Sequence, residues 1–479
     1  MNRPKSPVKQ LIRAALRDVT PIRLWVLFAA VGFGFTLFCV VSVITVRQHL
    51  HALKTVGSDA APSVISAHRI KIGLAAMDGA LADELMSVCG QRPARELNAD
   101  FEKNRLDVCR EIVSAAKNIT YEKEQAPIEN IQLALGQFLM QAQTARDLHQ
   151  EGKDAEAVVA YRVAWSTLKD KILPSADDLN LANSNVLEET YGRERSASAL
   201  SRGLVLVLGM VLICVLFYLH IYLSVHFHRR LNLPIIFSVV ILAIFLRFLT
   251  SALGESSMGL TRAKEEAYNS VLALLDARAS AYLADAALSR GLLDHENMQV
   301  NLTACKDSLD RIASFPDNVP GPVILYTAAK SLDAGRKPNL PNLTGALAQE
   351  LGNVQFDGEK EGAIDSFETF LVYRDRCAQQ RQLMTDGKDA DALCLGLGFD
   401  PHGTNMAFGR FDDALVRTLR INNTELEQSV RKARRALQFL EPGSIILSIL
   451  LVIATYLGLR PRIQEYQAES FLHRKNLRR

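Results

Sequence analysis

Four long apolar segments constrain this chain more than any other feature of its sequence. They cover residues 24–46, 203–225, 234–254 and 440–460, and only isolated charges interrupt them. A helix needs about 20 apolar residues to cross the hydrocarbon core of a bilayer. The sequence therefore predicts four membrane-spanning helices. The first is an uncleaved span, because its apolar run exceeds that of a signal peptide and no small-residue cleavage site follows it.

The charges between these spans predict the orientation of the chain. Residues 1–23 carry a net charge of +5, the link 226–233 carries +2, and the tail from Arg460 onward carries +4. The loops 47–202 and 255–439 carry −3 and −5. Because positive segments beside spans stay in the cytoplasm, we expect both termini, 1–23 and 461–479, to be cytoplasmic. Both long loops then lie outside the cell membrane.

Both long loops have the sequence pattern of helical bundles. Apolar residues from Val64 to Val88 recur every three or four positions, which is typical of a packed amphipathic helix. Residues 315–357 are rich in Pro and Gly and are expected to hold short helices at most. We expect a kink at Pro174, and helices that leave the membrane unbroken. The other expected helices are 96–117, 126–151 and 153–201, then 255–293, 296–313, 358–386 and 404–440.

The order span, long loop, span occurs twice, which indicates a tandem duplication. A constant offset pairs chemically similar residues of the two loops. The pairs are Ser63-Val64 with Ser270-Val271, Lys71 with Arg278, Asp78 with Asp285, Leu81 with Leu288 and Leu85 with Leu292. The predicted fold class is therefore an all-α membrane protein with four transmembrane helices and two extracytoplasmic helical-bundle domains.

The paired charges of the first loop helices are the leading candidates for a binding site. Lys71 and Asp78 are seven residues apart, as are Arg278 and Asp285, so each pair falls on one helix face. Such pairs form polar layers in a bundle, line a small-ligand pocket between helices, or belong to a solvated, salt-bridged face. Weaker candidates for ligand or partner binding are Tyr282, Arg290 and Asn405.

Charged residues in and beside the spans are a second group of candidates. Arg247 lies in the third span, about 9 Å from its outer end at 1.5 Å per residue, where it either snorkels to the interface or takes part in signalling. Arg229 and Arg230 are candidates for cytoplasmic output. His220, His226 and His228 are expected to be interfacial residues rather than metal ligands, so no metal site is predicted.

The cysteines of the long loops fit an oxidising compartment. Cys89 and Cys109 would close a hairpin tip as a disulfide. Cys305, Cys377 and Cys394 allow one pair and one free thiol, and three pairings remain open. Simple buried thiols are an equal alternative.

The sequence contains no motif of an enzyme. A Gly-rich phosphate loop, a His-Glu-x-x-His zinc motif, a Cys-x-x-Cys pair and a Gly-x-Ser-x-Gly elbow are all missing. The cytoplasmic pieces total roughly fifty residues, too few for a kinase or ATPase domain. We therefore expect no catalytic residue and no cofactor.

Three stretches resemble one family of bacterial membrane proteins. They are residues 275–294, residues 347–361 and residues 403–415. They resemble the four-pass membrane proteins of actinobacteria that partner an extracytoplasmic amino-acid-binding lipoprotein. The resemblance implies a relay of amino-acid status to a cytoplasmic serine/threonine kinase. Ala284 and Ala287 depart from the polar residues expected there, and no catalytic residues carry over.

These features together predict a non-enzymatic transmembrane receptor or transducer. Its outer bundles would bind a small ligand or a solute-binding protein, and its inner segments would signal to a kinase or another acidic partner, with no role for nucleic acid. The alternatives are a structural scaffold of a membrane or cell-envelope complex and an accessory subunit of a transporter. The sequence does not choose among oligomeric states.

Overall fold

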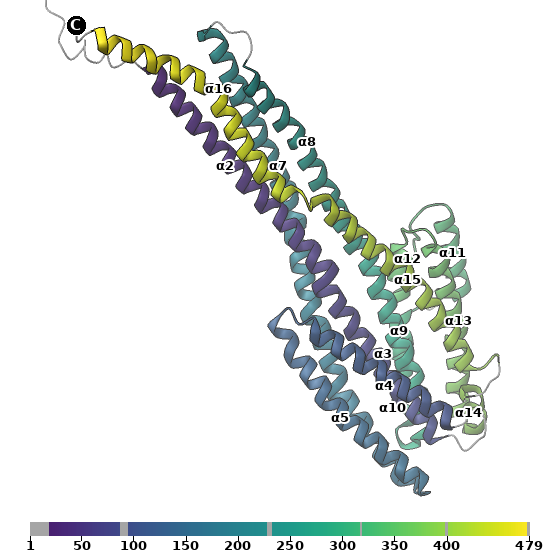
Figure 1. The fold of residues 1–479 in the computed structure, drawn as a ribbon. Helices are drawn as coiled ribbons and strands as arrows, with labels where there is room; N and C mark the ends of the chain where they lie inside the picture. Colours follow the sequence, from purple (N-terminus) through teal and green to yellow (C-terminus); the bar gives the residue numbers. More distant parts are fainter. Residues whose placement is uncertain (1–18, 87–93, 228–231, 317–318, 398–400, 477–479) are drawn as a thin grey trace, which may run out of the picture. The chain divides into compact units, whose positions relative to one another are not determined.

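The computed structural model describes residues 19–86, 94–227, 232–316, 319–397 and 401–476, nearly all of them in helices (Figure 1). The chain forms two compact units. We call residues 1–53, 192–259 and 431–479 the membrane unit, and residues 54–191 and 260–430 the bundle unit. The all-α prediction is confirmed, because the described residues contain no strand and only one isolated bridge, Ser314 with Thr344.

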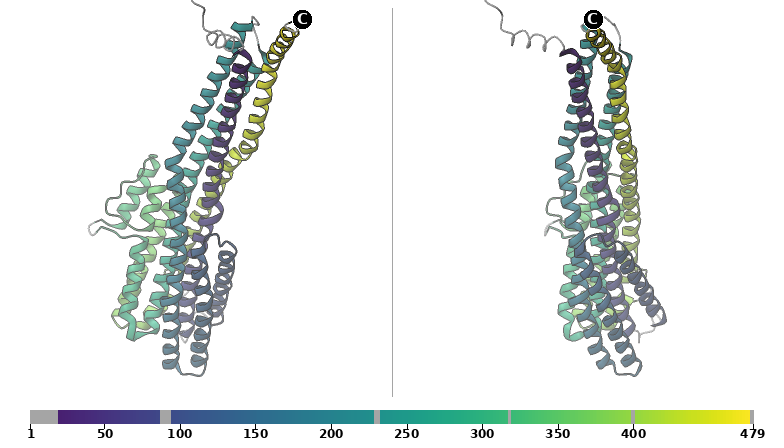
Figure 2. Two further views of the ribbon diagram at one scale, coloured as in Figure 1. Left: turned by 90° about the vertical axis from the view of Figure 1, so that its left-hand side faces the viewer. Right: turned by 60° about the vertical axis from the view of Figure 1, so that its left-hand side comes forward.

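The membrane unit contains the four predicted spans. They lie in α2 (Val19–Lys54), α7 (Leu173–Phe227), α8 (Leu233–Thr261) and α16 (Leu440–Asn476). Each contributes a segment long and apolar enough to cross a membrane. Figures 1 and 2 show these helices side by side. The prediction of four spans is therefore confirmed.

Glycines bring the helices of the membrane unit close together. A Cβ at Gly34 of α2 would lie 2.7 Å from Leu212 of α7, and one at Gly209 of α7 would lie 2.7 Å from Leu246 of α8. Close packing of small residues is how helices associate in lipid, where no hydrophobic force drives them together. Many large apolar side chains of the unit are exposed, which suits contact with lipid tails. They include Phe33, Val207, Ile244 and Ile446.

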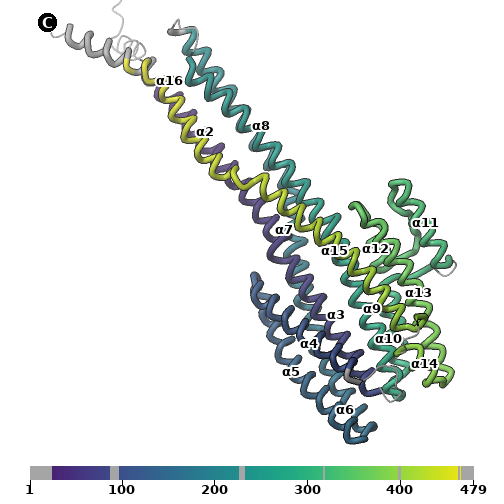
Figure 3. The backbone as a smooth tube through the Cα atoms, turned by 45° about the vertical axis from the view of Figure 1, so that its right-hand side comes forward, coloured from purple at the N-terminus to yellow at the C-terminus, as the bar shows by residue number. Residues whose placement is uncertain are grey.

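The bundle unit consists of a first bundle (residues 54–191) and a second bundle (residues 260–430), and each has its own apolar core. The helices of both are visible in Figure 3. The first bundle uses the start of α7 together with α3 (Ala60–Leu85), α4 (Ala94–Lys117), α5 (Glu122–Gln150) and α6 (Asp154–Thr167). The second uses α9 (Asn269–Leu293), α10 (Met298–Ile312), α11 (Gly321–Asp333), α12 (Ala346–Asn353), α13 (Glu359–Thr385), α14 (Asp389–Leu397) and α15 (Thr404–Leu437).

Widened π-helical turns join several of these helices without a break. They are η1 (Thr55–Asp59) between α2 and α3, η3 (Leu168–Ile172) between α6 and α7, and η4 (Arg262–Tyr268) between α8 and α9. The short 3₁₀ turn η5 (His295–Asn297) precedes α10. We expected a kink at Pro174, and the π-turn η3 lies directly before this residue. Proline cannot donate the backbone hydrogen bond that a regular α-helix needs, which accounts for a widened turn at this place.

The fourth long helix does not follow the expectation of continuity. A turn at residues 438–439 separates α15 from α16. Pro442 is the physical reason, because proline is tolerated in the first turn of a helix but not in its interior. The break before Pro442 was not predicted from the sequence.

An asparagine holds the π-turn in each bundle. Asn118 Nδ2 donates to the carbonyl oxygen of Asp59 at 2.7 Å and to Ser63 Oγ at 2.8 Å. Asn353 Nδ2 lies 2.7 Å from the carbonyl oxygen of Glu266 and 2.9 Å from Ser270 Oγ. The acceptors differ by 207 residues and the asparagines by 235.

The residues after each asparagine also repeat. Glu124 Oε2 accepts from the backbone N–H of Tyr121 at 2.8 Å, and Glu359 Oε2 accepts from that of Phe356 at 3.0 Å. Both pairs differ by 235 residues. The sequences are Asn-Ile-Thr-Tyr-Glu-Lys-Glu from residue 118 and Asn-Val-Gln-Phe-Asp-Gly-Glu from residue 353. The change of offset from 207 to 235 reflects the longer connection through α10, α11 and α12. These repeated contacts support a tandem duplication.

Candidate functional site: the polar contact between the two bundles

The two bundles meet where α3 crosses α9. A Cβ at Gly79 would lie 3.5 Å from the Cα of Ala286, the residue at the equivalent position of the other bundle. Met86 of α3 packs against the second core, and its equivalent Leu293 of α9 packs against the first. Equivalent residues thus exchange places across the contact, as in the interface of a symmetric dimer.

A buried ion pair crosses this contact. Asp78 of α3 is 0% exposed and pairs with the guanidinium of Arg290 of α9, which is 3% exposed. Tyr161 of α6 donates its hydroxyl to Asp78 at 2.8 Å. The guanidinium of Arg290 lies 3.6 Å from the ring centroid of Trp165, and its Nε donates to Asn301 at 3.2 Å. Residues of both bundles therefore complete the surroundings of each charge.

Burial dominates the electrostatics of this cluster. It raises the pKa of Asp78, while the charge of Arg290 and the hydroxyl of Tyr161 pull that pKa back. Burial also raises the pKa of Tyr161 well above its ordinary value, so Tyr161 remains a protonated donor. A buried charge is tolerated only when it is paired and hydrogen-bonded. Separating the bundles would therefore cost free energy unless water replaced these contacts.

A second ion pair lies closer to solvent. Arg162 of α6 forms two hydrogen bonds to Asp294 at 2.7 and 2.5 Å, and it also pairs with Glu296 at 2.7 Å. Asp294 is buried, which raises its pKa, but the bonds from Arg162 and Asn297 outweigh burial and lower the pKa overall. The first bundle thus holds the start of α10 through one arginine.

The charged residues predicted as candidates on the first helix of each bundle pair with residues of other helices. Lys71 does not pair with Asp78 but with Asp177, at 2.8 Å. Arg278 binds Asp412 through two hydrogen bonds of 2.5 and 3.0 Å. These two pairs are equivalent, since Lys71 and Arg278 differ by 207 residues and their partners by 235. They join the first and last helices of each bundle.

The remaining predicted site residues do not gather into one site. Tyr282 donates its hydroxyl to Asp412 at 3.1 Å and so extends the Arg278 pair. Asp285 lies near Tyr373 and Cys377 in the second bundle, where burial raises the pKa of both groups and the charge of Asp285 adds to the rise. Asn405 is half-buried near the start of α15.

Two of the three cysteines whose pairing the sequence leaves open lie together. Cys305 of α10 and Cys377 of α13 are both 0% exposed and contact each other as free thiols, while Cys394 is exposed. Burial raises the pKa of Cys377 well above its usual range. Cys109 is a half-buried free thiol, and its expected partner Cys89 lies outside the described residues.

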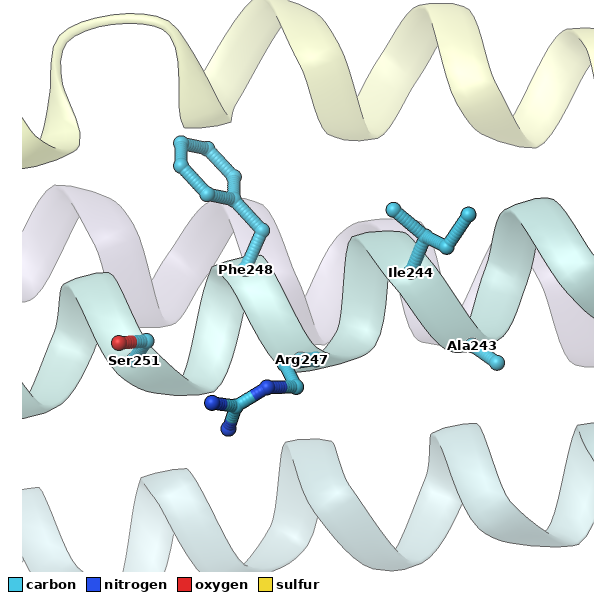
Figure 4. Close-up of a pocket in the computed structure, with 5 residues that line it drawn as sticks. All are labelled: Ala243, Ile244, Arg247, Phe248 and Ser251. Carbon is cyan, nitrogen blue, oxygen red and sulfur yellow. The ribbon is translucent and has the colours of Figure 1, made fainter.

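Arg247 lines a shallow hollow on α8 with four other residues, as Figure 4 shows. They are Ala243, Ile244, Phe248 and Ser251. The output candidates Arg229 and Arg230 lie outside the described residues. Within the part of the chain that the structure describes, no three His, Cys, Asp or Glu side chains are placed to hold a metal.

Half of the polar contact was not predicted from the sequence. Asp78 and Arg290 were among the predicted candidates, but Tyr161 and Trp165 of α6, which contact them, were not. Arg162 of α6, which binds Asp294, was not predicted either. The pairing of Asp78 with Arg290 could not be seen in the sequence, because 212 residues separate the two charges. A tryptophan and an arginine three residues apart in a predicted helix were the available hint.

Comparison with known proteins identifies one domain. Residues 52–192 match the model of a family described as an actinobacterial sensor domain. The match covers the first bundle and leaves the second bundle and most of the spans outside it. No curated protein and no solved structure matches the chain. The matched family indicates a sensing or signal-transducing role for a multi-pass membrane protein.

Proposed function

We propose that this protein is a non-enzymatic receptor that relays an extracytoplasmic signal across the membrane through a shift between its two bundles. The observation that carries the proposal is the sensor-domain match over residues 52–192, which lies between the first two predicted spans, 24–46 and 203–225. A sensing bundle held directly between two spans is suited to pass a change of helix packing into them.

The contact between the bundles is the element we expect to have two states. Polar residues at a packed interface specify one arrangement, and a ligand changes that arrangement only if it binds the alternative more tightly. The pairs of Asp78 with Arg290 and of Arg162 with Asp294 make the resting arrangement specific. A ligand or a solute-binding protein seated on one bundle would act by weakening or strengthening these pairs.

The charge distribution supports an output on the cytoplasmic side. Net charges of +5, +2 and +4 on the short segments, against −3 and −5 on the two long loops, favour a cytoplasmic position of the short segments by the positive-inside rule. These short segments would present their basic groups to a kinase or another acidic partner. The resemblance to the four-pass partners of amino-acid-binding lipoproteins supports amino-acid status as the signal.

Two variants test this function in cells. The first ends the chain before Gln464, and the second changes Arg229 and Arg230 to Glu. Each is purified from native membranes after cross-linking, and the proteins that accompany it are identified with and without added amino acids. We expect both variants to keep extracytoplasmic partners and to lose a cytoplasmic partner whose association depends on amino acids.

A matched variant examines the bundle contact. A Cβ at Gly79 would lie 3.5 Å from the Cβ of Ala286 in the other bundle, so cysteines at these two positions would lock the contact when oxidised. We expect the locked protein to keep its partners but lose the amino-acid response, and reduction to restore it. A set of partners that never changes with amino acids, locked or unlocked, would favour the scaffold.

A further inference from the structure

The second bundle buries two polar side chains near its π-turn that have no polar counterpart in the first bundle. Glu350 of α12 and Asn422 of α15 are both 0% exposed. With the offset of 235 residues that relates the two bundles here, their counterparts are Ala115 and Leu187, which are buried and apolar. The first bundle therefore shows that this scaffold folds without polar groups at these positions.

The added groups lie beside a carboxylate common to both bundles. Glu359, the counterpart of Glu124, is 0% exposed, and its Oε2 caps the turn by accepting from Gln355 N at 2.6 Å and Phe356 N at 3.0 Å. Glu350 lies close enough to Glu359 for the two charges to repel each other. The second bundle therefore buries two carboxyl groups where the first buries one.

The two carboxyl groups share the same two polar neighbours, since Ser270 and Asn422 each form a side-chain hydrogen bond with both Glu350 and Glu359. No further donor among the residues that the structure describes reaches the carboxylate oxygens of Glu350, Oε1 of Glu359 or Oδ1 of Asn422. Asn422 also donates its amide nitrogen to the carbonyl oxygen of Thr418, at 3.3 Å, so one amide group serves three acceptors.

We propose that Glu350, Glu359, Asn422 and Ser270 of the second bundle bind a hard divalent cation, Ca²⁺ or Mg²⁺. Two carboxylates, an amide oxygen and a hydroxyl are the donors that these ions prefer, and they provide no nitrogen or sulfur ligand for zinc. Two negative charges balance one divalent ion. Neutral oxygens complete the donor set, so the site needs no third acidic group.

The position of the site gives the cation a structural role. Ser270 also accepts from Asn353, the residue that holds the carbonyl oxygens of Glu265 and Glu266 in the π-turn η4. A cation on Ser270 would join α9, α12, α13 and α15 at this turn. The second bundle would then be fixed by an ion where the first relies on apolar packing.

Direct binding measurements test the site in the full-length chain. The protein is purified in detergent, stripped with EDTA and titrated calorimetrically with CaCl₂ or MgCl₂. We expect one equivalent of at least one of the two ions to bind, and its addition to raise the thermal midpoint. Glu350→Gln should weaken binding by more than about tenfold, while the matched first-bundle variant Glu124→Gln should leave it unchanged.

A double variant separates cation binding from folding. Glu350→Ala with Asn422→Leu copies the first bundle, so it should fold without cation, be at least as stable as stripped wild type and show no response to either ion. Stoichiometric binding that survives in this variant would overturn the site. So would a wild-type protein that binds neither ion, because its two carboxyl groups would then be held by protons alone.

Discussion

Replacing Arg290 by methionine should destabilise the bundle unit in a way that depends strongly on pH. Methionine keeps most of the volume of the arginine stem but removes the charge that pairs with Asp78. Asp78 is 0% exposed and has Tyr161 as its other donor. The variant therefore leaves it either as a buried unpaired charge or as a neutral acid.

The free-energy cost of protonating Asp78 sets an upper limit on the destabilisation. Taking up a proton at pH 7, from an unfolded-state pKa of 3.8, costs at most about 4.4 kcal/mol at 1.36 kcal/mol per pH unit. At pH 5 the same step costs only about 1.6 kcal/mol. Loss of the cation–π contact with Trp165 adds about 1–2 kcal/mol at either pH.

The sign follows from the direction of the pKa shift. Burial raises the pKa of Asp78, and without Arg290 only Tyr161 opposes that rise, so the folded variant loses stability as pH rises from 3.8 towards the raised value. The stability difference between variant and wild type should therefore be larger at pH 7 than at pH 5, by at most about 3 kcal/mol.

Tryptophan fluorescence provides the assay. The chain has two tryptophans, Trp25 and Trp165, so a Trp25→Phe background leaves only the residue that stacks on Arg290. Urea unfolding is followed at pH 5, 6 and 7. Asp78→Asn in the Arg290→Met background should remove the pH dependence, and Lys71→Met, at a pair with a 60% exposed partner, should cost no more than about 1 kcal/mol. An equal loss at pH 5 and pH 7 would refute the reasoning.

Three further outcomes are expected. Acidification below pH 3.8 should release the Arg162 contact, because the lowered pKa of Asp294 stabilises the fold above that value and this contribution is lost as Asp294 protonates; hydrogen exchange at the start of α10 would report it. Asn118→Ala should destabilise the first bundle by about 1–3 kcal/mol, because Ser63 Oγ loses its donor and the carbonyl oxygen of Asp59 keeps only the hydroxyl of Ser63 as a side-chain donor; thermal unfolding would measure this. In intact cells, single cysteines at the exposed positions 150 and 388 should react with a membrane-impermeant reagent, and protection of both would reverse the proposed topology.

The spans and the principal helices could be predicted because their signals are local. Long apolar runs and a three-to-four-residue period depend only on neighbours in the sequence. The expected helix at 358–386 is α13 (Glu359–Thr385), and the expected helix at 296–313 is α10 (Met298–Ile312). The turn at residues 438–439, which Pro442 explains, the π-turns η3 and η4, and the helix α14 (Asp389–Leu397) were not predicted.

The partners of the charged residues could not be predicted in the same way. Lys71 and Asp78 share one face of a helix but lie two turns apart along it, and each pairs with a residue of another helix. The signal that would have helped was present in the chain. The repeated Asn-x-x-aromatic-x-x-Glu sequence at residues 118 and 353 extends the duplication well beyond the first helix of each loop.

The crossing of α3 and α9 at Gly79 and Ala286 has a consequence for how the protein responds to its own abundance. Two separate copies of one bundle would meet through such a surface only above their dissociation constant. Two bundles on one chain meet at an effective concentration that is typically millimolar for a short connection, whatever the expression level. Fusion also frees the two faces to diverge. A symmetric contact would contain the same ion pair twice. Here Asp78 pairs with Arg290 only once, because the residue equivalent to Arg290 in the first bundle is Asp83, which cannot pair with Asp285, the equivalent of Asp78.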